Sequence, residues 1–131
     1  MKGIVITALQ EAQPDERGTA FELSLAGRSG AMYLTRKQGT ISGRHYHLGK
    51  TAGKNPEVII IFSGIAEFYC KDLKTKEEMT VVISVPTRIE VAPSIWHELK
   101  ALTDITLIEL SSLEEHKQDT VRDLDDTKAN T

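Results

Sequence analysis

The chain has 131 residues, of which 40% are hydrophobic and 27% are charged, and its formal net charge is −3 at pH 7. This length suits a single domain with its own hydrophobic core, and the acidic balance excludes a broad basic surface for nucleic acid. No apolar run is long enough to cross a membrane, and residues 1–7 turn polar too early for a signal peptide. The single cysteine, Cys70, excludes an internal disulfide and suits a reducing compartment, so we expect a cytoplasmic protein.

The first part of the chain is predicted to form short strands separated by glycine-rich turns. Residues 3–9 are the first candidate strand. Residues 21–25 alternate apolar and polar side chains, and residues 31–34 do so more loosely, which predicts two further strands. The glycines between these segments mark turns.

Residues 57–69 carry the strongest strand signal. Isoleucine and valine dominate their first part, a Ser-Gly pair follows, and a second apolar stretch begins at Ile65, so two strands joined by a tight turn are expected. The charged residues 70–78 are predicted to form a hairpin loop, and residues 79–83 the next strand.

The last part of the chain continues this pattern and then changes character. Residues 86–92 and 104–110 are predicted strands. Residues 113–126 are acidic and compatible with a short helix or an irregular cap, and residues 127–131 are expected to be a disordered tail. Many short strands with one late helical segment predict an all-β barrel or double-sheet sandwich, built as one domain over residues 1–126.

Three of the four histidines stand in a pattern typical of a metal site. His45 and His47 are two residues apart, so their side chains share a face only on a strand. Together with Glu57 and His97 they supply three imidazoles and one carboxylate, a donor set for a divalent metal ion such as Zn, Ni, Mn or Fe. We predict that these four residues bind such an ion. A metal-free pocket, in which the histidines transfer protons, remains the alternative.

The spacing of these residues resembles that of the cupin family. The first cupin motif is matched by Gly39, His45, His47, Glu57 and Gly64, and the second by Pro93 and His97. The resemblance implies a double-stranded β-helix, the cupin jelly-roll barrel, with the ligands inside it. Two departures stand out: the loop of residues 48–56 is longer than the family's, and the glycine of the second motif is missing.

Within the cupins, the chain is most similar to the sugar-nucleotide 3,4-ketoisomerases and their epimerase-like relatives. Residues 15–18, 43–47, 96–98 and 119–125 carry this resemblance. It implies that His45 or His47 moves a proton between adjacent carbons of a keto sugar in deoxysugar biosynthesis, without a metal. Two positions differ from the pattern of this family: Ser42 stands where the family has an arginine, and Glu57 stands where an amide is expected. These two differences make the chain more similar to the metal-binding cupins.

Other side chains near the site are assigned from strand alternation and composition. Tyr33 is predicted to face inward from a neighbouring strand as a catalytic acid or base. Trp96 is predicted to line the substrate pocket, with core packing as the alternative. Arg44 and Tyr46 should face away from the two strand histidines, and His116 is expected to be solvated.

The favoured function is therefore a metal-binding cupin with a small-molecule pocket, acting as an isomerase or epimerase on a sugar or nucleotide-linked keto sugar. Two alternatives stay open: a metal-dependent dioxygenase or lyase of a small acid, and a non-catalytic module that binds a sugar or another small ligand. We expect a homodimer, with residues 3–9 as a strand that could be exchanged between subunits, and no nucleic-acid or membrane partner.

Overall fold

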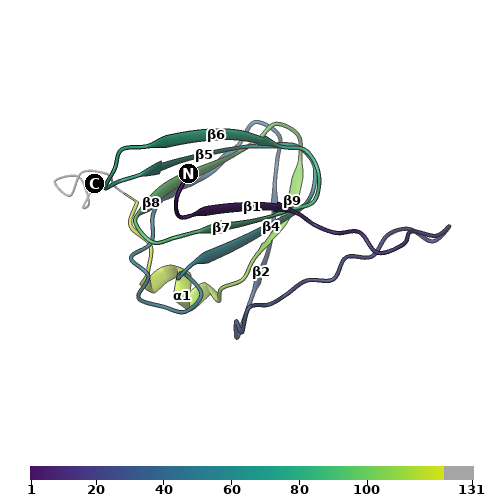
Figure 1. The fold of residues 1–131 in the computed structure, drawn as a ribbon, viewed down its shortest axis with the longest axis horizontal. Helices are drawn as coiled ribbons and strands as arrows, with labels where there is room; N and C mark the ends of the chain where they lie inside the picture. Colours follow the sequence, from purple (N-terminus) through teal and green to yellow (C-terminus); the bar gives the residue numbers. More distant parts are fainter. Residues whose placement is uncertain (123–131) are drawn as a thin grey trace.

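A computed structural model describes residues 1–122 of the chain (Figure 1). Within these residues lie nine strands and one helix: β1 (Ile4–Ala8), β2 (Met32–Arg36), β3 (Ile41–His45), β4 (Glu57–Ser63), β5 (Ala66–Asp72), β6 (Glu78–Ile83), β7 (Thr87–Val91), β8 (Ile95–Ala101), β9 (Ile105–Glu109) and α1 (Leu113–Gln118). The end of the predicted domain and the predicted tail, residues 127–131, lie outside the described residues.

The strands form two antiparallel sheets, which confirms the all-β prediction. One sheet has the order β1-β7-β4-β9-β2 and the other the order β3-β8-β5-β6. Figure 1 shows the sheets packed face to face. β2 and β3 are both edge strands, and their inward-facing side chains line one cavity between the sheets. The site described below lies in this cavity.

The hydrophobic core fills the other part of the space between the sheets. It includes Phe68 of β5, Ile89 of β7 and Ile105 of β9, none more than 1% exposed. β4 is buried on both faces, because Val58 and Ile60 on its outer face belong to a second cluster that is partly covered by Leu9 and Leu23. A strand covered on both faces is a continuous apolar run rather than an alternating one, as the sequence of β4 is.

Several strand predictions need correction. Residues 21–25 form no strand: Phe21 makes only an isolated bridge with Glu11, and Leu23 packs on the outer face of the first sheet. Apolar and polar side chains alternate in residues 21–25 because one side packs on the sheet. No other segment of residues 1–122 pairs with them to form a β-ladder. The β5–β6 hairpin extends into the predicted loop 70–78, with Cys70 paired to Met79 and Lys71 to Glu78. β8 was not predicted at all.

The short helix α1 confirms the predicted C-terminal cap. Ser112 accepts a hydrogen bond from the backbone of Glu115, and the Glu115 side chain accepts one from the backbone of Ser112, which is a complete capping box. β1 pairs with β7 of its own chain at the edge of its sheet, and homodimerisation stays a prediction. None of the helices in residues 1–122 has the length and hydrophobicity that a membrane span requires.

Candidate functional site

The four predicted metal ligands converge on one point. His45, His47, Glu57 and His97 are each at most 6% exposed, and one ligand atom from each lies within 4.8 Å of the others. β3 ends at His45, which is paired directly with His97 of β8. The chain stays extended beyond β3, because Tyr46 forms a bridge with Val121. The i, i+2 histidines therefore share a face, as predicted.

A local irregularity in β3 aims His45 inward. The register with β8 shifts between Gly43 and His45, and Gly43 has a φ of 84°. A Cβ added to Gly43 would lie 2.9 Å from the carbonyl oxygen of His97, so no larger residue fits without moving backbone. Arg44 turns outward and lies 3.3 Å from Glu98, which confirms that it faces away from the histidines.

Hydrogen bonds fix the orientation of two imidazoles. His47 Nδ1 is 2.6 Å from the carbonyl oxygen of Asp119, and His97 Nδ1 is 3.0 Å from that of Ile95. A carbonyl oxygen only accepts, so each Nδ1 carries the proton. The two Nε2 atoms face the Glu57 carboxylate, at 3.0 Å for His47 and 2.8 Å for His97. This is the usual arrangement of histidine ligands around a metal, but two imidazolium ions would also produce it.

A buried lysine, which the sequence analysis did not single out, lies beside these residues. Lys54 is 0% exposed. Its Nζ is 2.7 Å from Oε2 of Glu57 and 3.5 Å from Oε1 of Glu109. The only sequence signal was a lysine-bearing loop of unusual length before Glu57. The long loop thus places a buried cation beside the Glu57 carboxylate.

The charges shift the pKa values of the cluster in opposite directions. Burial would raise the pKa of Glu57, but His97 and His47 hold it well below its ordinary value. Burial would lower the pKa of His97, but the Glu57 carboxylate raises it above the ordinary value. Burial, reinforced by His97, lowers the pKa of His45 to about 2. His45 is therefore a neutral imidazole at pH 7, which suits a metal ligand better than a general base.

The fourth histidine also belongs to the site, contrary to the expectation that it is solvated. His116 on α1 lies with its ring centroid 5.4 Å from that of His45. Burial and the nearby Lys54 lower its pKa to about 4. Glu109, at the end of β9, faces the same cavity, and burial and Glu57 raise its pKa to about 7. Neither residue could be placed from sequence, because α1 and β9 reach the site only through tertiary packing.

Asp119 connects the long loop to the cap. Its carboxylate accepts hydrogen bonds from the backbone of Leu48 at 2.8 Å and of Thr51 at 3.0 Å. Nearby, the Glu115 carboxylate accepts one from the backbone of Gly53 at 2.7 Å. Asp119 is 1% exposed, so it is a structural anchor rather than part of a solvated acidic cap. Loop 48–56 and the C-terminal cap hold each other in place around His47.

Replacing Asp119 with alanine is expected to lower the free energy of unfolding by about 2 kcal/mol, because two part-buried backbone donors lose a charged acceptor. Urea denaturation measures the change. Asp119→Asn keeps one side-chain oxygen acceptor and should lose clearly less. Equal losses for the two variants would contradict this explanation.

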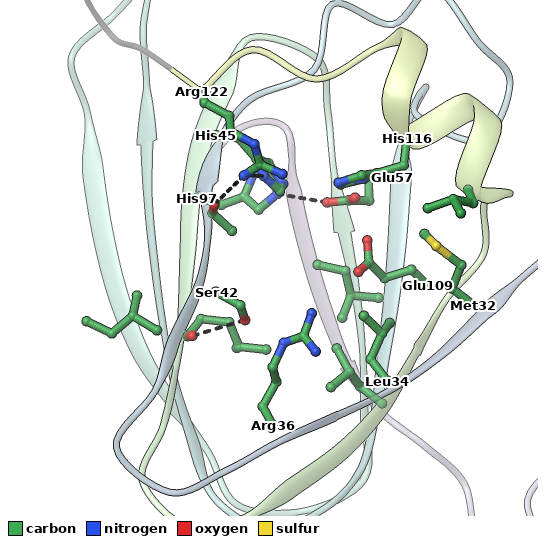
Figure 2. Close-up of a pocket in the computed structure, with 16 residues that line it drawn as sticks. Met32, Leu34, Arg36, Ser42, His45, Glu57, His97, Glu109, His116 and Arg122 are labelled. Atoms are coloured by element: carbon green, nitrogen blue, oxygen red, sulfur yellow. Dashed lines mark hydrogen bonds and ion pairs between the residues drawn. The ribbon is translucent and has the colours of Figure 1, made fainter. Parts of the chain in front are cut away.

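The cluster forms one end of a cavity of about 400 Å³. His45, Glu57, His97, Glu109 and His116 line this end, and Arg36 lies at the other end (Figure 2). His47 is not among the lining residues, so it is less suited than His45 to touch a substrate.

The predictions for two aromatic residues are wrong. Tyr33 is 68% exposed, because Met32, Leu34 and Arg36 are the inward side of β2. Trp96 is buried but does not line the cavity, since His97 and Leu99 are the inward side of β8.

The chain matches no protein-family model and no curated protein, but it resembles solved structures. One is a double mutant of the QdtA 3,4-ketoisomerase from Thermoanaerobacterium thermosaccharolyticum in complex with TDP, with 19% identity and a TM-score of 0.76 over 94% of this chain and 89% of that one. Another is a 3,4-ketoisomerase from Helicobacter canadensis, with 18% identity and a TM-score of 0.74 over 98% of both chains.

A third similar structure is the dTDP-4-dehydrorhamnose 3,5-epimerase from Sulfolobus tokodaii, with 17% identity and a TM-score of 0.70 over 84% of this chain and 70% of that one. These proteins are of the cupin type. The chain shares their jelly-roll fold, which confirms the predicted double-stranded β-helix.

Proposed function

We propose that the protein binds a divalent metal ion through His45, His47, Glu57 and His97, and that it acts as an isomerase or epimerase on a sugar-type carbonyl compound in the adjoining cavity. The observation that carries the metal proposal is the orientation of the donors. His47 and His97 use Nδ1 for backbone carbonyls and direct Nε2 toward one carboxylate.

The residues present fit a metal in two further respects. Glu57 Oε1 and His97 Nε2 are buried and lie 2.8 Å apart, yet neither has a hydrogen-bond partner of acceptable geometry. Buried polar atoms without partners are rare, and a shared cation would satisfy both. Lys54 contacts Glu57 through Oε2, which is compatible with coordination through Oε1, because carboxylate ligands are commonly hydrogen-bonded by a neighbouring group.

The cavity suits a small carbonyl substrate. Its volume of about 400 Å³ lies in the range of ordinary ligand sites, about 300–1,000 Å³. A bound metal would polarise a carbonyl oxygen of the substrate. His45, His116 and Glu109 face the same space, and the Glu109 carboxyl group is placed to hold or accept a proton there. The reaction class is supported by the similar structures, which are described as ketoisomerases and epimerases.

Elemental analysis of protein purified without a histidine tag tests the metal site. We expect near-stoichiometric divalent metal in the wild type and loss of most of it in His47→Ala and Glu57→Gln. His116→Ala is the matched control, because it removes a neighbouring imidazole that is outside the proposed ligand set. Metal-free wild type after soaking in Zn, Ni, Mn and Fe(II), or unchanged metal in the ligand variants, would refute the site.

Solvent deuterium exchange tests the reaction. TDP-4-keto-6-deoxyglucose, which is bound in one of the similar structures, would be incubated with the protein in D₂O and followed by NMR. We expect deuterium to appear at the carbon next to the ketone, even if net conversion is slow, and Glu57→Gln to abolish the exchange. Absence of exchange with the metal-loaded wild type would remove this substrate from consideration.

One observation favours a second candidate, a metal-free isomerase with the same fold. The Lys54 ammonium group already neutralises Glu57 at 2.7 Å, so the cluster could remain stable without a metal. Exchange at full rate in chelator-treated protein would select this candidate over the metal-dependent one.

A further inference from the structure

Arg36 is a cation in the cavity wall that forms no ion pair with any residue between positions 1 and 122. The one hydrogen bond that its side chain makes within this range joins Nη1 to the carbonyl oxygen of Thr35, at 3.0 Å. The other cations of the cavity region are engaged: Lys54 contacts Glu57 and Glu109, and Arg122 lies 3.2 Å from the carbonyl oxygen of Gly43. Arg36 therefore keeps most of its donors available to a ligand.

The strand β2 directs this side chain into the cavity. Met32, Leu34 and Arg36 alternate with outward residues along the strand and all three line the cavity. Figure 2 shows the Arg36 guanidinium group pointing into the cavity, with Leu34 and Ser42 beside it and the histidine cluster at the opposite end. The Ser42 hydroxyl contacts the carbonyl oxygen of Leu99 at only 3.5 Å, a weak hydrogen bond that a ligand could replace.

Arg36 lies apart from the other charged groups that line the cavity. Glu57, Glu109 and Arg122 lie at the histidine end, and Arg36 at the other. The walls also include aliphatic side chains such as Ile59 and Leu107, and no Phe, Tyr or Trp of residues 1–122 lines the cavity. A ligand therefore gains little orientation from stacking. Polar groups at the two ends of the ligand must therefore orient it, through contacts with the charged side chains at the two ends of the cavity.

We infer that Arg36 binds an anionic group of the substrate, a phosphate or a carboxylate, and thereby presents the other end of the molecule to the histidine cluster. A guanidinium fork matches the two oxygens of either group. Partial burial strengthens the contact, because the surroundings screen charge less than water does. The orientation of the reacting end rests on the proposed function, whereas anion binding at Arg36 does not.

Calorimetric titration of the full chain tests the inference, with chelator present so that no anion binds through a metal. The probes are dTDP and inorganic pyrophosphate for phosphate, malonate for carboxylate, and thymidine as the uncharged reference. We expect at least one anion to bind the wild type more tightly than thymidine, with an affinity that falls as salt is added. Whether the phosphate probes or malonate bind more tightly identifies the source of the anion.

Variants separate this site from general electrostatics. Arg36→Gln should weaken the binding of the anion about tenfold or more, and Arg36→Lys should retain part of it. Arg44→Gln is the matched control, since Arg44 is exposed and paired with Glu98 outside the cavity. Thermal denaturation without probe checks that each variant is folded. Equal affinities in wild type and Arg36→Gln, or no anion binding by the wild type, would overturn the inference, and neither result depends on the metal measurement.

Discussion

Replacing Lys54 with methionine is expected to lower the free energy of unfolding by about 3 kcal/mol, because removal of the ammonium group leaves only His47 and His97 to offset the charge of the buried Glu57 carboxylate. The Lys54 side chain is 0% exposed, and its Nζ lies 2.7 Å from Glu57 and 3.5 Å from Glu109. Methionine fills much of the same volume, so the loss reports the charge rather than a cavity. Urea denaturation of chelator-treated protein measures it without a contribution from bound metal.

Two further variants show whether the loss comes from the buried carboxylates. Lys100→Met, at an exposed position of β8, should change stability by less than about 0.5 kcal/mol. Measured at pH 8, above the pKa of about 7 of Glu109, adding Glu109→Gln to Lys54→Met should recover part of the loss, because one of the two negative charges disappears. A loss below about 1 kcal/mol for Lys54→Met, or no recovery in the double variant, would mean that the ion pairs contribute little.

In the metal-free protein, the contribution of Glu109 to stability is expected to fall as the pH rises from about 4.5 to 7. Burial and Glu57 raise the pKa of Glu109 to about 7 from the ordinary value of 4.5. Between these values the unfolded chain has released this proton and the folded protein still holds it. Stability from Glu109 is therefore complete below pH 4.5 and lost as the pH passes 7. The loss amounts to about 3 kcal/mol, at about 1.4 kcal/mol per pKa unit.

Four neighbouring groups shape the rest of this pH profile. The raised pKa of His97 acts in the same direction, since its contribution is complete below the ordinary value of 6.5 and is lost as the pH rises through the raised value. The lowered pKa of Glu57 acts oppositely, since its contribution is present above 4.5 and is lost as the pH falls. The lowered pKa values of His45, about 2, and His116, about 4, also act against Glu109, because below the ordinary value of 6.5 the unfolded chain binds these protons before the folded protein does. These two histidines outweigh Glu109 between about pH 4.5 and 6.5, so stability should rise over this range and be greatest near pH 6.5.

Urea denaturation across this pH range, with chelator present, checks the assignment. Glu109→Gln should steepen the rise in stability between about pH 4.5 and 6.5, whereas Glu16→Gln, at an exposed position, should leave it unchanged. A profile that is the same in wild type and Glu109→Gln would exclude a contribution from Glu109.

The sequence was sufficient to place the four predicted ligands together. His45 and His47 have a spacing that only extended chain converts into a shared face, and the spacing to Glu57 and His97 matched known motifs. Tyr33 and Trp96 could not be assigned in the same way. In a short strand with apolar residues at both odd and even positions, alternation does not show which side faces the core. Only the packing of β2 and β8 against the opposite sheet decided which side chains point inward.

By itself, the sequence determined the all-β character of the chain, the extended segment that carries His45 and His47, the strand that begins at Glu57, and the donor set, because periodicity and motif spacing are local properties. Tertiary structure alone decided the rest of the site. Lys54, Glu109, His116 and Asp119 come from a long loop, a strand end and a cap. The unusual length of the loop and the resemblance of residues 119–125 draw attention to two of these segments, but neither feature predicts that Lys54 or Asp119 is buried at the site. Their burial and their partners depend on contacts between residues far apart in the chain, which also set the pKa values on which the chemistry of the site depends.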